Sequence, residues 1–341
     1  MISKIYDKVK KFIKENYKEI LFLIAFYLFM TYPLPYYISV SGGTIDVGDR
    51  LVVEGAYKEK GSFNLAYVTE LKSTIPTYLL SYIIPSWERV SIGNYQISEE
   101  ESMEELVNRD ILYLNQASQS AIYVAYTKAN KTFDITDHHY YVYYADDRAS
   151  SDILVGDELI GFENIDALDL DKLKDVIDSK KVGDNILLKL KRGNKTLDVK
   201  TSIYEEEGIK YIGIMFFDLF DYKLDPSLEL KFENGESGPS GGLTLSLAIY
   251  NKLVEEDITR GLKIVGTGTI DVEGNVGEIG GVKYKLMGAV KSKADVFLVP
   301  TGSNYDECIK LKKEKNYDIE IIGVSTFDEA LQKLSEVSIK K

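Results

Sequence analysis

The sequence contains few of the residues that common catalytic and stabilising chemistries need. It has 341 residues but one cysteine and two histidines. A single cysteine excludes an internal disulfide, and we expect Cys308 to be a small buried hydrophobic residue. The histidines, His138 and His139, are adjacent, and we interpret both as exposed residues at a strand edge. A serine–histidine–aspartate triad would have to borrow one of them from another domain, and a base other than histidine is the preferred interpretation for a serine nucleophile in this chain.

Positive charge is also in short supply. The 41 lysines and arginines are outnumbered by 54 acidic residues, which gives a net charge of −13. This balance argues against nucleic-acid binding, because nucleic-acid-binding proteins present a basic face. No Gly-x4-Gly-Lys-Ser/Thr phosphate loop occurs, so the chain by itself has no ATP site of that type. We predict no cofactor and no metal.

The N-terminal region combines a basic lead with a long uncharged run. Residues 20–40 carry no charge, a length of about 20 residues that suits a bilayer. With the positive charge on the N-terminal side alone, residues 1–19 are predicted to be cytoplasmic, residues 20–40 a single-pass transmembrane helix and the rest extracellular. A cleaved signal peptide is the alternative, with a weak small-x-small match at residues 39–41, and it would leave a soluble hydrolase. The basic lead consists of Lys4, Lys8, Lys10, Lys11, Lys14 and Lys18.

The next region changes from strands to a helix and then to a small module. Residues 41–132 are expected to form short strands followed by a helix over 103–129, because acids precede helically spaced apolar residues there. Residues 133–205 then alternate strand patterns, a helix over Leu168–Ile177, and a hairpin over Ile186–Thr201 that turns at Arg192-Gly193.

This module resembles a PDZ domain of the bacterial protease type, on the strand residues 155–160, the helix and the hairpin. PDZ domains bind an extended peptide as an added strand beside one edge. The resemblance places that edge near Tyr140–Tyr144. The sequence departs from the family because no glycine-rich loop precedes this strand, only Thr136-Asp137-His138-His139, so recognition of a free C-terminus is left open.

A glycine-rich turn, Gly238-Pro239-Ser240-Gly241-Gly242, precedes an apolar segment over Leu243–Leu253 that predicts a buried helix. Glycine permits backbone angles that other residues resist, so Ser240 can be held on a tight turn. The free N–H groups at the helix start can stabilise an oxyanion. A serine that caps the helix is the structural alternative, and this motif alone does not separate the two.

A lysine in a second glycine-rich context can supply the missing base. Lys285 follows Gly280-Gly281 and is predicted to lie near the start of a helix over Lys285–Ala294. Burial lowers the pKa of a lysine, so that it can accept a proton near neutral pH. Lys283 is the rival, but residues two apart on a helix point to different faces. An exposed lysine is the alternative for either position.

Residues 207–335 resemble the proteolytic domain of the Lon family, which uses a serine–lysine dyad. The resemblance implies that Ser240 is the nucleophile, Lys285 the general base and Thr267 a residue that orients the lysine. It further implies that the backbone N–H groups of Ser240 and Ser237 form the oxyanion hole, although many family members carry an acid where Ser237 stands. The motifs that carry it are Gly238–Leu243, Thr267–Ile270, Gly274–Lys285 and Phe297–Pro300.

The whole chain resembles the ATP-independent, membrane-anchored PDZ–Lon-like proteases of Gram-positive bacteria. This implies an α+β multidomain protein with an N-terminal transmembrane helix, a PDZ-like β-rich module and a Lon-type α/β domain over 206–341. The implied activity is that of a serine endopeptidase that cleaves exported peptides or membrane and secreted proteins, and the family suggests a homo-oligomeric ring. The alternative is a catalytically silent Lon-fold platform for peptide binding or assembly, which predicts a missing serine or lysine, yet both are present. The sequence identifies no substrate-binding residues.

Overall fold

The chain forms two compact units in its computed structural model, which describes residues 2–98, 101–165, 169–233 and 235–338. The first unit consists of residues 1–41 and 68–95, and the second of residues 42–67 and 96–341.

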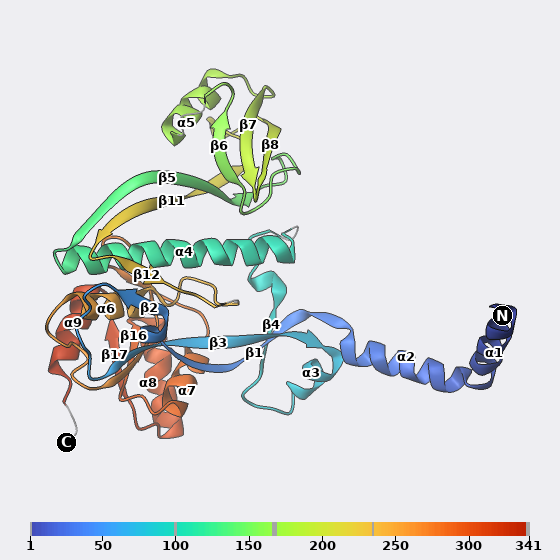
Figure 1. Cartoon of the computed structure of the whole chain (residues 1–341), viewed down its shortest axis with the longest axis horizontal. Helices are drawn as coiled ribbons and strands as arrows, with labels where there is room; N and C mark the ends of the chain where they lie inside the picture. The colour runs from blue at the N-terminus through green and yellow to red at the C-terminus, as the bar shows by residue number, and fades with distance from the viewer. Residues whose placement is uncertain (1, 99–100, 166–168, 234, 339–341) are drawn as a thin grey trace. The chain divides into compact units, whose positions relative to one another are not determined.

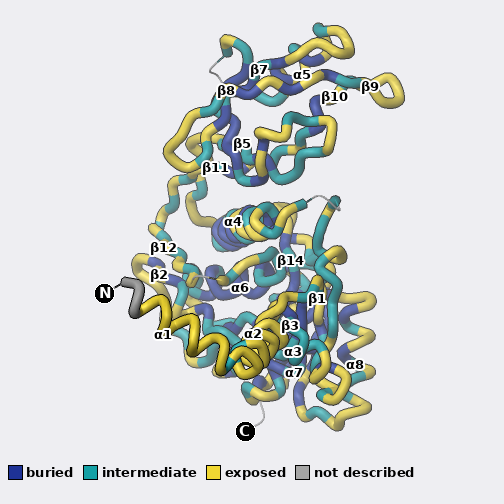
Figure 2. The backbone as a smooth tube through the Cα atoms, turned by 90° about the vertical axis from the view of Figure 1, so that its right-hand side faces the viewer, coloured by how far each residue is buried: buried dark blue, intermediate teal, exposed yellow. Residues whose placement is uncertain are grey.

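The first unit begins with two helices whose side chains are largely exposed, drawn in yellow in Figure 2. The second of them has an apolar sequence, YKEILFLIAFYLFMT, yet none of its residues is buried. The strand that follows pairs antiparallel with a short strand through Tyr36–Ser39. The elements are α1 (Ile2–Glu15), α2 (Tyr17–Thr31), β1 (Pro33–Asp46), α3 (Ile75–Leu80), β4 (Glu88–Ser91) and the 3-10 turn η2 (Ile92–Asn94).

The prediction of a transmembrane helix over residues 20–40 is wrong. Helix α2 ends at Thr31, and residues 33–40 belong to strand β1 because Pro33 and Pro35 cannot continue a helix. Fifteen residues of helix extend about 22 Å, short of the roughly 30 Å hydrocarbon core of a bilayer. Across the residues that the structure describes, no helix is both long and apolar enough to span a membrane. This finding contradicts the predicted single-pass anchor and the extracellular placement derived from it, and the fold is a mixed α/β one without that helix.

A six-stranded sheet, in the order β17-β16-β13-β3-β1-β4, joins distant parts of the chain. Four neighbouring strands, β3 (Ser62–Thr74), β13 (Lys263–Gly266), β16 (Val296–Pro300) and β17 (Glu320–Val324), run parallel. Every residue of β16 is buried, as expected for a strand covered on both faces. Residues 62–65 pair with β13, so residues before position 100 contribute to the same sheet as the C-terminal region.

Helices pack around this sheet and form the main core. The predicted helix over 103–129 is present as α4 (Met103–Lys128), which begins with a capping box between Ser102 and Glu105. It packs against α6 (Gly242–Leu253), as Figure 1 shows. Ala121 and Val124 of α4 share a buried cluster with Leu247 of α6. The remaining helices are α7 (Val282–Lys291), α8 (Ser303–Lys315), which the sequence interpretation did not include, and α9 (Phe327–Glu336).

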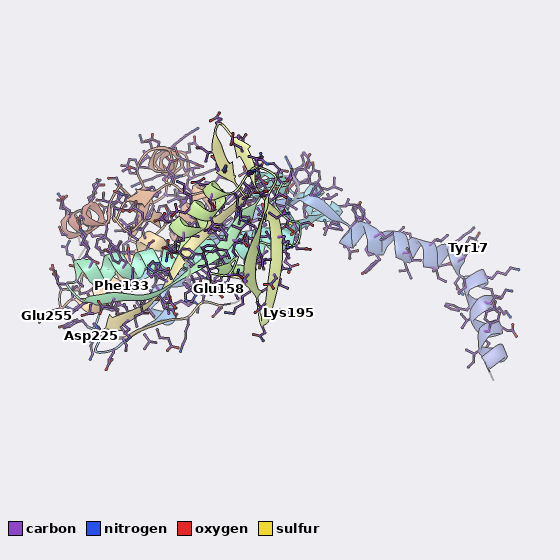
Figure 3. All side chains as sticks on the ribbon, turned by 90° about the horizontal axis from the view of Figure 1, so that it is seen from above. Tyr17, Phe133, Glu158, Lys195, Asp225 and Glu255 are labelled. Carbon is purple, nitrogen blue, oxygen red and sulfur yellow. The ribbon has the colours of Figure 1, made fainter. Side chains whose placement is uncertain are left out.

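The second sheet has the order β11-β5-β6-β7-β8 and its own core. Its first two strands form a long antiparallel ribbon, and β7 and β8 form the predicted hairpin, with Lys195 at its turn (Figure 3). Helix α5 (Leu170–Ser179) contributes Leu173 and Ile177 to this core, while the predicted helix start at Leu168 lies outside the described residues. The strands are β5 (Thr132–Ala145), β6 (Glu158–Phe162), β7 (Asn185–Arg192), β8 (Lys195–Ser202) and β11 (Ile214–Asp225).

Short elements complete the second unit. The strand β12 leads from β11 toward Ser240 and pairs with β2, which follows the turn η1. These elements are η1 (Val47–Arg50), β2 (Leu51–Val53), β9 (Tyr204–Glu206), β10 (Ile209–Tyr211), β12 (Leu228–Leu230), β14 (Thr269–Ile270) and β15 (Val276–Gly277).

Candidate active site

Ser240 lies half-buried on the turn that leads into helix α6. The turn needs glycine at position 238, where φ is +84°, a conformation that side chains with a Cβ resist. The Gly238 N–H donates to the Asp110 carbonyl of α4 over 3.1 Å, which ties the turn to that helix. Helix α6 begins two residues after Ser240, so the serine sits at the positive end of the helix dipole.

Close packing fixes the start of α6. A Cβ at Gly242 would lie 2.9 Å from Ile270 Cγ2, so any larger residue would push the helix away from its neighbours. The following residues, Leu243, Leu245 and Leu247, are buried in the main core. The position of Ser240 is therefore set by a helix that has little freedom to move.

Lys285 lies in the first turn of α7, which starts after Gly281 in the left-handed conformation, at φ +66°. The lysine is 4% exposed. Burial lowers the pKa of Lys285 to about 8, because a low-dielectric surrounding disfavours the ammonium ion. Lysine at this position therefore carries the neutral, proton-accepting form at mildly alkaline pH.

Thr267 connects the lysine to the serine residue. Thr267 is fully buried just after β13. Lys285 Nζ donates to Thr267 Oγ1 over 3.2 Å, and Thr267 Oγ1 donates to the Ser240 carbonyl over 3.1 Å. The Gly268 N–H donates to the same carbonyl over 2.8 Å. Within the described part of the chain, no hydrogen bond joins the Ser240 hydroxyl to Lys285 directly, so the hydroxyl of Thr267 is the link.

The rival bases lie in different surroundings. Lys283 is half-buried, and its ammonium group lies 4.8 Å from the centroid of the Tyr284 ring. His138 is exposed on β5 and contacts Asp218. His139 bonds to Glu158 Oε1 over 2.8 Å, which raises its pKa. Both histidines are thus engaged with carboxylates of the second sheet.

The predicted oxyanion donors lie on either side of Pro239. Ser237 is exposed and Ser240 half-buried. Among the residues that the structure describes, neither backbone N–H donates a backbone hydrogen bond. In the described part of the chain, no group of three or more His, Cys, Asp or Glu side chains is arranged to hold a metal ion.

Sequence reasoning missed the contributions of residues far from the motif. The Asp110 carbonyl accepts from Gly238, and a Cβ at Gly241 would lie 3.0 Å from Leu65 Cδ2, so α4 and β3 both shape the turn. No local pattern in the sequence marks either residue, because their roles depend on tertiary packing.

The second sheet places its free edge on a different strand from the predicted one. The strand around Tyr140–Tyr144 pairs with β11 on one side, and on the other side Tyr140 and Tyr141 pair with β6. The outer strand of the sheet is β11. The prediction that the Tyr140–Tyr144 strand offers a peptide-accepting edge is therefore wrong, because a ribbon partner from residues 214–225 covers it.

A glycine turn precedes β11, the outer strand of this sheet. It reads Tyr211-Ile212-Gly213-Ile214, and Gly213 has φ +74°. Ile212 is buried in the same core as Ile177 of α5. Lys210 Nζ donates to the Asp178 carbonyl near the end of α5 over 2.7 Å. A glycine turn, an edge strand and a helix thus lie together at this side of the module.

Comparison with known proteins finds similarity in the C-terminal region. Residues 234–336 match the family model described as the Lon protease (S16) C-terminal proteolytic domain. The Lon protease of Campylobacter jejuni subsp. jejuni is 36% identical over 98 residues, which cover 28% of this chain and 12% of that protein. The archaeal Lon protease of Halobacterium salinarum is 31% identical over 99 residues, 29% of this chain and 14% of that protein.

These matches define the class of the domain. The predicted enzyme class, a serine peptidase, is confirmed for residues 234–336 by the Lon-type match. The chain spans about an eighth of the length of the Campylobacter relative, 12%. Among solved structures, the PDZ domain of an SdrC-like protein from Listeria monocytogenes is 28% identical, covers 24% of this chain and 90% of that chain, and has a TM-score of 0.22.

Proposed function

We propose that this chain is a serine endopeptidase in which Ser240 is the nucleophile and Lys285 the general base. The observation that carries the proposal is the buried Lys285, whose pKa is lowered to about 8 and whose ammonium group bonds to Thr267 beside Ser240. A buried lysine without a carboxylate partner is costly, so its presence beside a serine turn favours a chemical role.

The chemistry follows from these positions. Neutral Lys285 takes the proton of the Ser240 hydroxyl as the serine oxygen attacks the scissile carbonyl carbon. The backbone N–H groups of Ser237 and Ser240 stabilise the negative oxygen that develops. The lysine then protonates the leaving amine, which frees an acyl-enzyme. Water, deprotonated by Lys285, hydrolyses the ester and restores the serine.

We further propose that the 341 residues act without ATP, since they contain no Gly-x4-Gly-Lys-Ser/Thr loop. The PDZ-like module at 133–205, extended by β11, recruits the substrate as an added strand beside β11, which is the outer strand of the sheet in the described part of the chain. The chain is also proposed to form a ring of identical subunits, as the family resemblance suggests.

Peptide cleavage by matched variants tests the dyad. Wild-type protein should cleave an unfolded protein substrate without ATP, and both Ser240→Ala and Lys285→Ala should lose at least about a thousandfold in rate. Lys283→Ala, the matched control two residues away, should retain wild-type activity. Full activity in either dyad variant would refute the assignment, and an inactive wild type would favour the peptide-holding platform.

Variants of Gly213 test recruitment at β11. A Cβ there would lie 2.4 Å from Asp146 Oδ1 and would be strained at its positive φ, so Gly213→Val should distort the turn. We expect a raised KM for substrates of about 20 residues, which extend to roughly 65 Å, and an unchanged rate for tetrapeptides, which extend to roughly 13 Å. Lys200→Ala, on the opposite edge strand β8, is the control. Equal KM values for long substrates in all three proteins would exclude recruitment at β11.

A further inference from the structure

The segment that carries the predicted oxyanion donors lies between β12 and α6, in neither helix nor strand among its described residues. A backbone N–H that binds an oxyanion must be fixed in direction before the reaction. The end of the segment is held by the bonds to the Ser240 carbonyl and its middle by the Gly238–Asp110 bond. The residues just before Ser237 are held by other contacts.

Arg50, from a distant part of the chain, holds the residues just before Ser237. It ends the turn η1, and its guanidinium donates to Glu236 Oε1 from Nη2 over 2.8 Å and from Nε over 3.2 Å. Its Nη1 donates to Glu233 Oε1 over 2.9 Å. The Arg50 carbonyl also accepts from the Lys231 N–H over 2.9 Å. One residue therefore fixes the path of the chain at positions 231, 233 and 236.

The burial of these groups separates this network from an ordinary surface ion pair. The side chains of Arg50 and Glu236 are 17% and 20% exposed, whereas that of Glu233 is 72% exposed. The planar guanidinium fork fixes direction as well as distance, which a lysine ammonium does not. The Glu233 N–H donates to Glu236 Oε2 over 3.2 Å, so both oxygens of the Glu236 carboxylate are used.

We propose that Arg50 is a positioning residue of the peptidase site. It holds Glu236, and through it directs the adjacent Ser237 N–H and the turn that carries Ser240. The inference rests on the proposed function and adds to it a residue from the turn η1 of the second unit. Arg50 bonds to neither Ser240 nor Lys285 in the described structure, so it acts on the donors of the oxyanion hole rather than on the base.

Steady-state kinetics of Arg50→Ala and Glu236→Gln on a fluorogenic peptide test this role. Loss of one oxyanion donor lowers kcat by about a hundredfold to a thousandfold, so loosening its support should lower kcat by roughly tenfold to a hundredfold. KM should change less than about twofold, because transition-state stabilisation is lost and substrate binding is kept. The midpoint of the pH–rate profile should stay in place, since Lys285 is untouched. Arg50→Lys should restore part of kcat.

Arg260→Ala is the matched control for a purely structural arginine. Arg260 donates to the carbonyls of Leu334, Ser335 and Val337 at the end of α9, away from the turn. The Arg260→Ala substitution should lower the melting temperature and leave kcat per folded molecule unchanged.

Two results would overturn the role of Arg50. Wild-type kcat in Arg50→Ala and Glu236→Gln would overturn the proposal, as would a loss of kcat that only follows the unfolded fraction, as in Arg260→Ala. If Arg50→Ala does not fold, Glu236→Gln, which keeps the size of the side chain, decides alone. Failure of the proposed function is distinct, because Ser240→Ala would then behave like wild type.

Discussion

Replacing Lys285 with methionine should stabilise the folded protein at pH 7 while abolishing peptide cleavage. Burial lowers the pKa of this lysine from 10.5 to about 8. Each pKa unit corresponds to about 1.4 kcal/mol, so at pH 7 the buried ammonium costs about 3 kcal/mol of folding free energy. Methionine fills similar space without charge, and the variant should recover most of this amount.

The pH dependence gives the sign of the effect. Because the folded-state pKa is below that of the unfolded chain, the folded protein binds fewer protons between about pH 8 and 10.5. The contribution of Lys285 to stability therefore rises with pH through this window and is least favourable below it. The advantage of Lys285→Met over wild type should be largest at pH 7 and should shrink toward pH 10.

Urea unfolding of both proteins at pH 7 and pH 10 measures the difference, and peptide cleavage is assayed in parallel. Lys283→Met is the matched control, because Lys283 is half-buried whereas Lys285 is 4% exposed, so its replacement should give no comparable gain in stability at pH 7 and should keep the activity. A Lys285→Met variant that is no more stable than wild type at pH 7, or whose advantage does not shrink with pH, would refute the reasoning.

Three further outcomes follow from single side chains. Thr267→Val removes the hydroxyl that receives the Lys285 bond and should lower kcat/KM by about tenfold to a hundredfold in peptide cleavage; unchanged kcat/KM would remove Thr267 from the site. Thr244→Val should raise stability by about 1 kcal/mol in urea unfolding, because the buried Thr244 hydroxyl has no hydrogen-bond partner among the described residues; a loss of stability would contradict this. His139→Gln should destabilise the protein more at pH 5.5 than at pH 8, because Glu158 raises the pKa of His139 in the folded protein. The stabilisation by protonated His139 is present below about pH 6.5 and is lost as the pH rises through the higher folded-state pKa. Equal losses of stability at both pH values would contradict this.

Local patterns in the sequence predicted the elements that local forces determine. The apolar run after Gly242, the all-apolar strand at 296–300 and the hairpin over 186–201 lie where predicted. In each case a run of side chains or a turn specifies the element without reference to distant residues. Lys285 and Thr267 could be proposed from the family resemblance, and the structure places their side chains in contact.

Contacts between distant segments could not be predicted in the same way. The pairing of residues 62–65 with β13 and the bond from Arg50 to Glu236 join positions about 200 residues apart, and no periodicity reports them. The prediction of a membrane-spanning helix was wrong because it counted uncharged residues beyond Pro33, whereas the helix ends at Thr31 and Pro33 begins strand β1. The edge strand was misplaced because β11 comes after the module in the sequence but borders it in space.

The ribbon of β5 and β11 makes the second sheet an insertion in the chain between α4 and β12. The chain leaves α4 along β5 and comes back along β11, with Thr132 directly opposite Asp225, and Phe133 and Asp225 lie at the same end of the ribbon in Figure 3. Because entry and exit are adjacent, a short turn could close the chain there without moving α4 or β12. The second sheet and the core that carries Ser240 are thus joined through the two paired strands β5 and β11, so one could be exchanged while the other is kept.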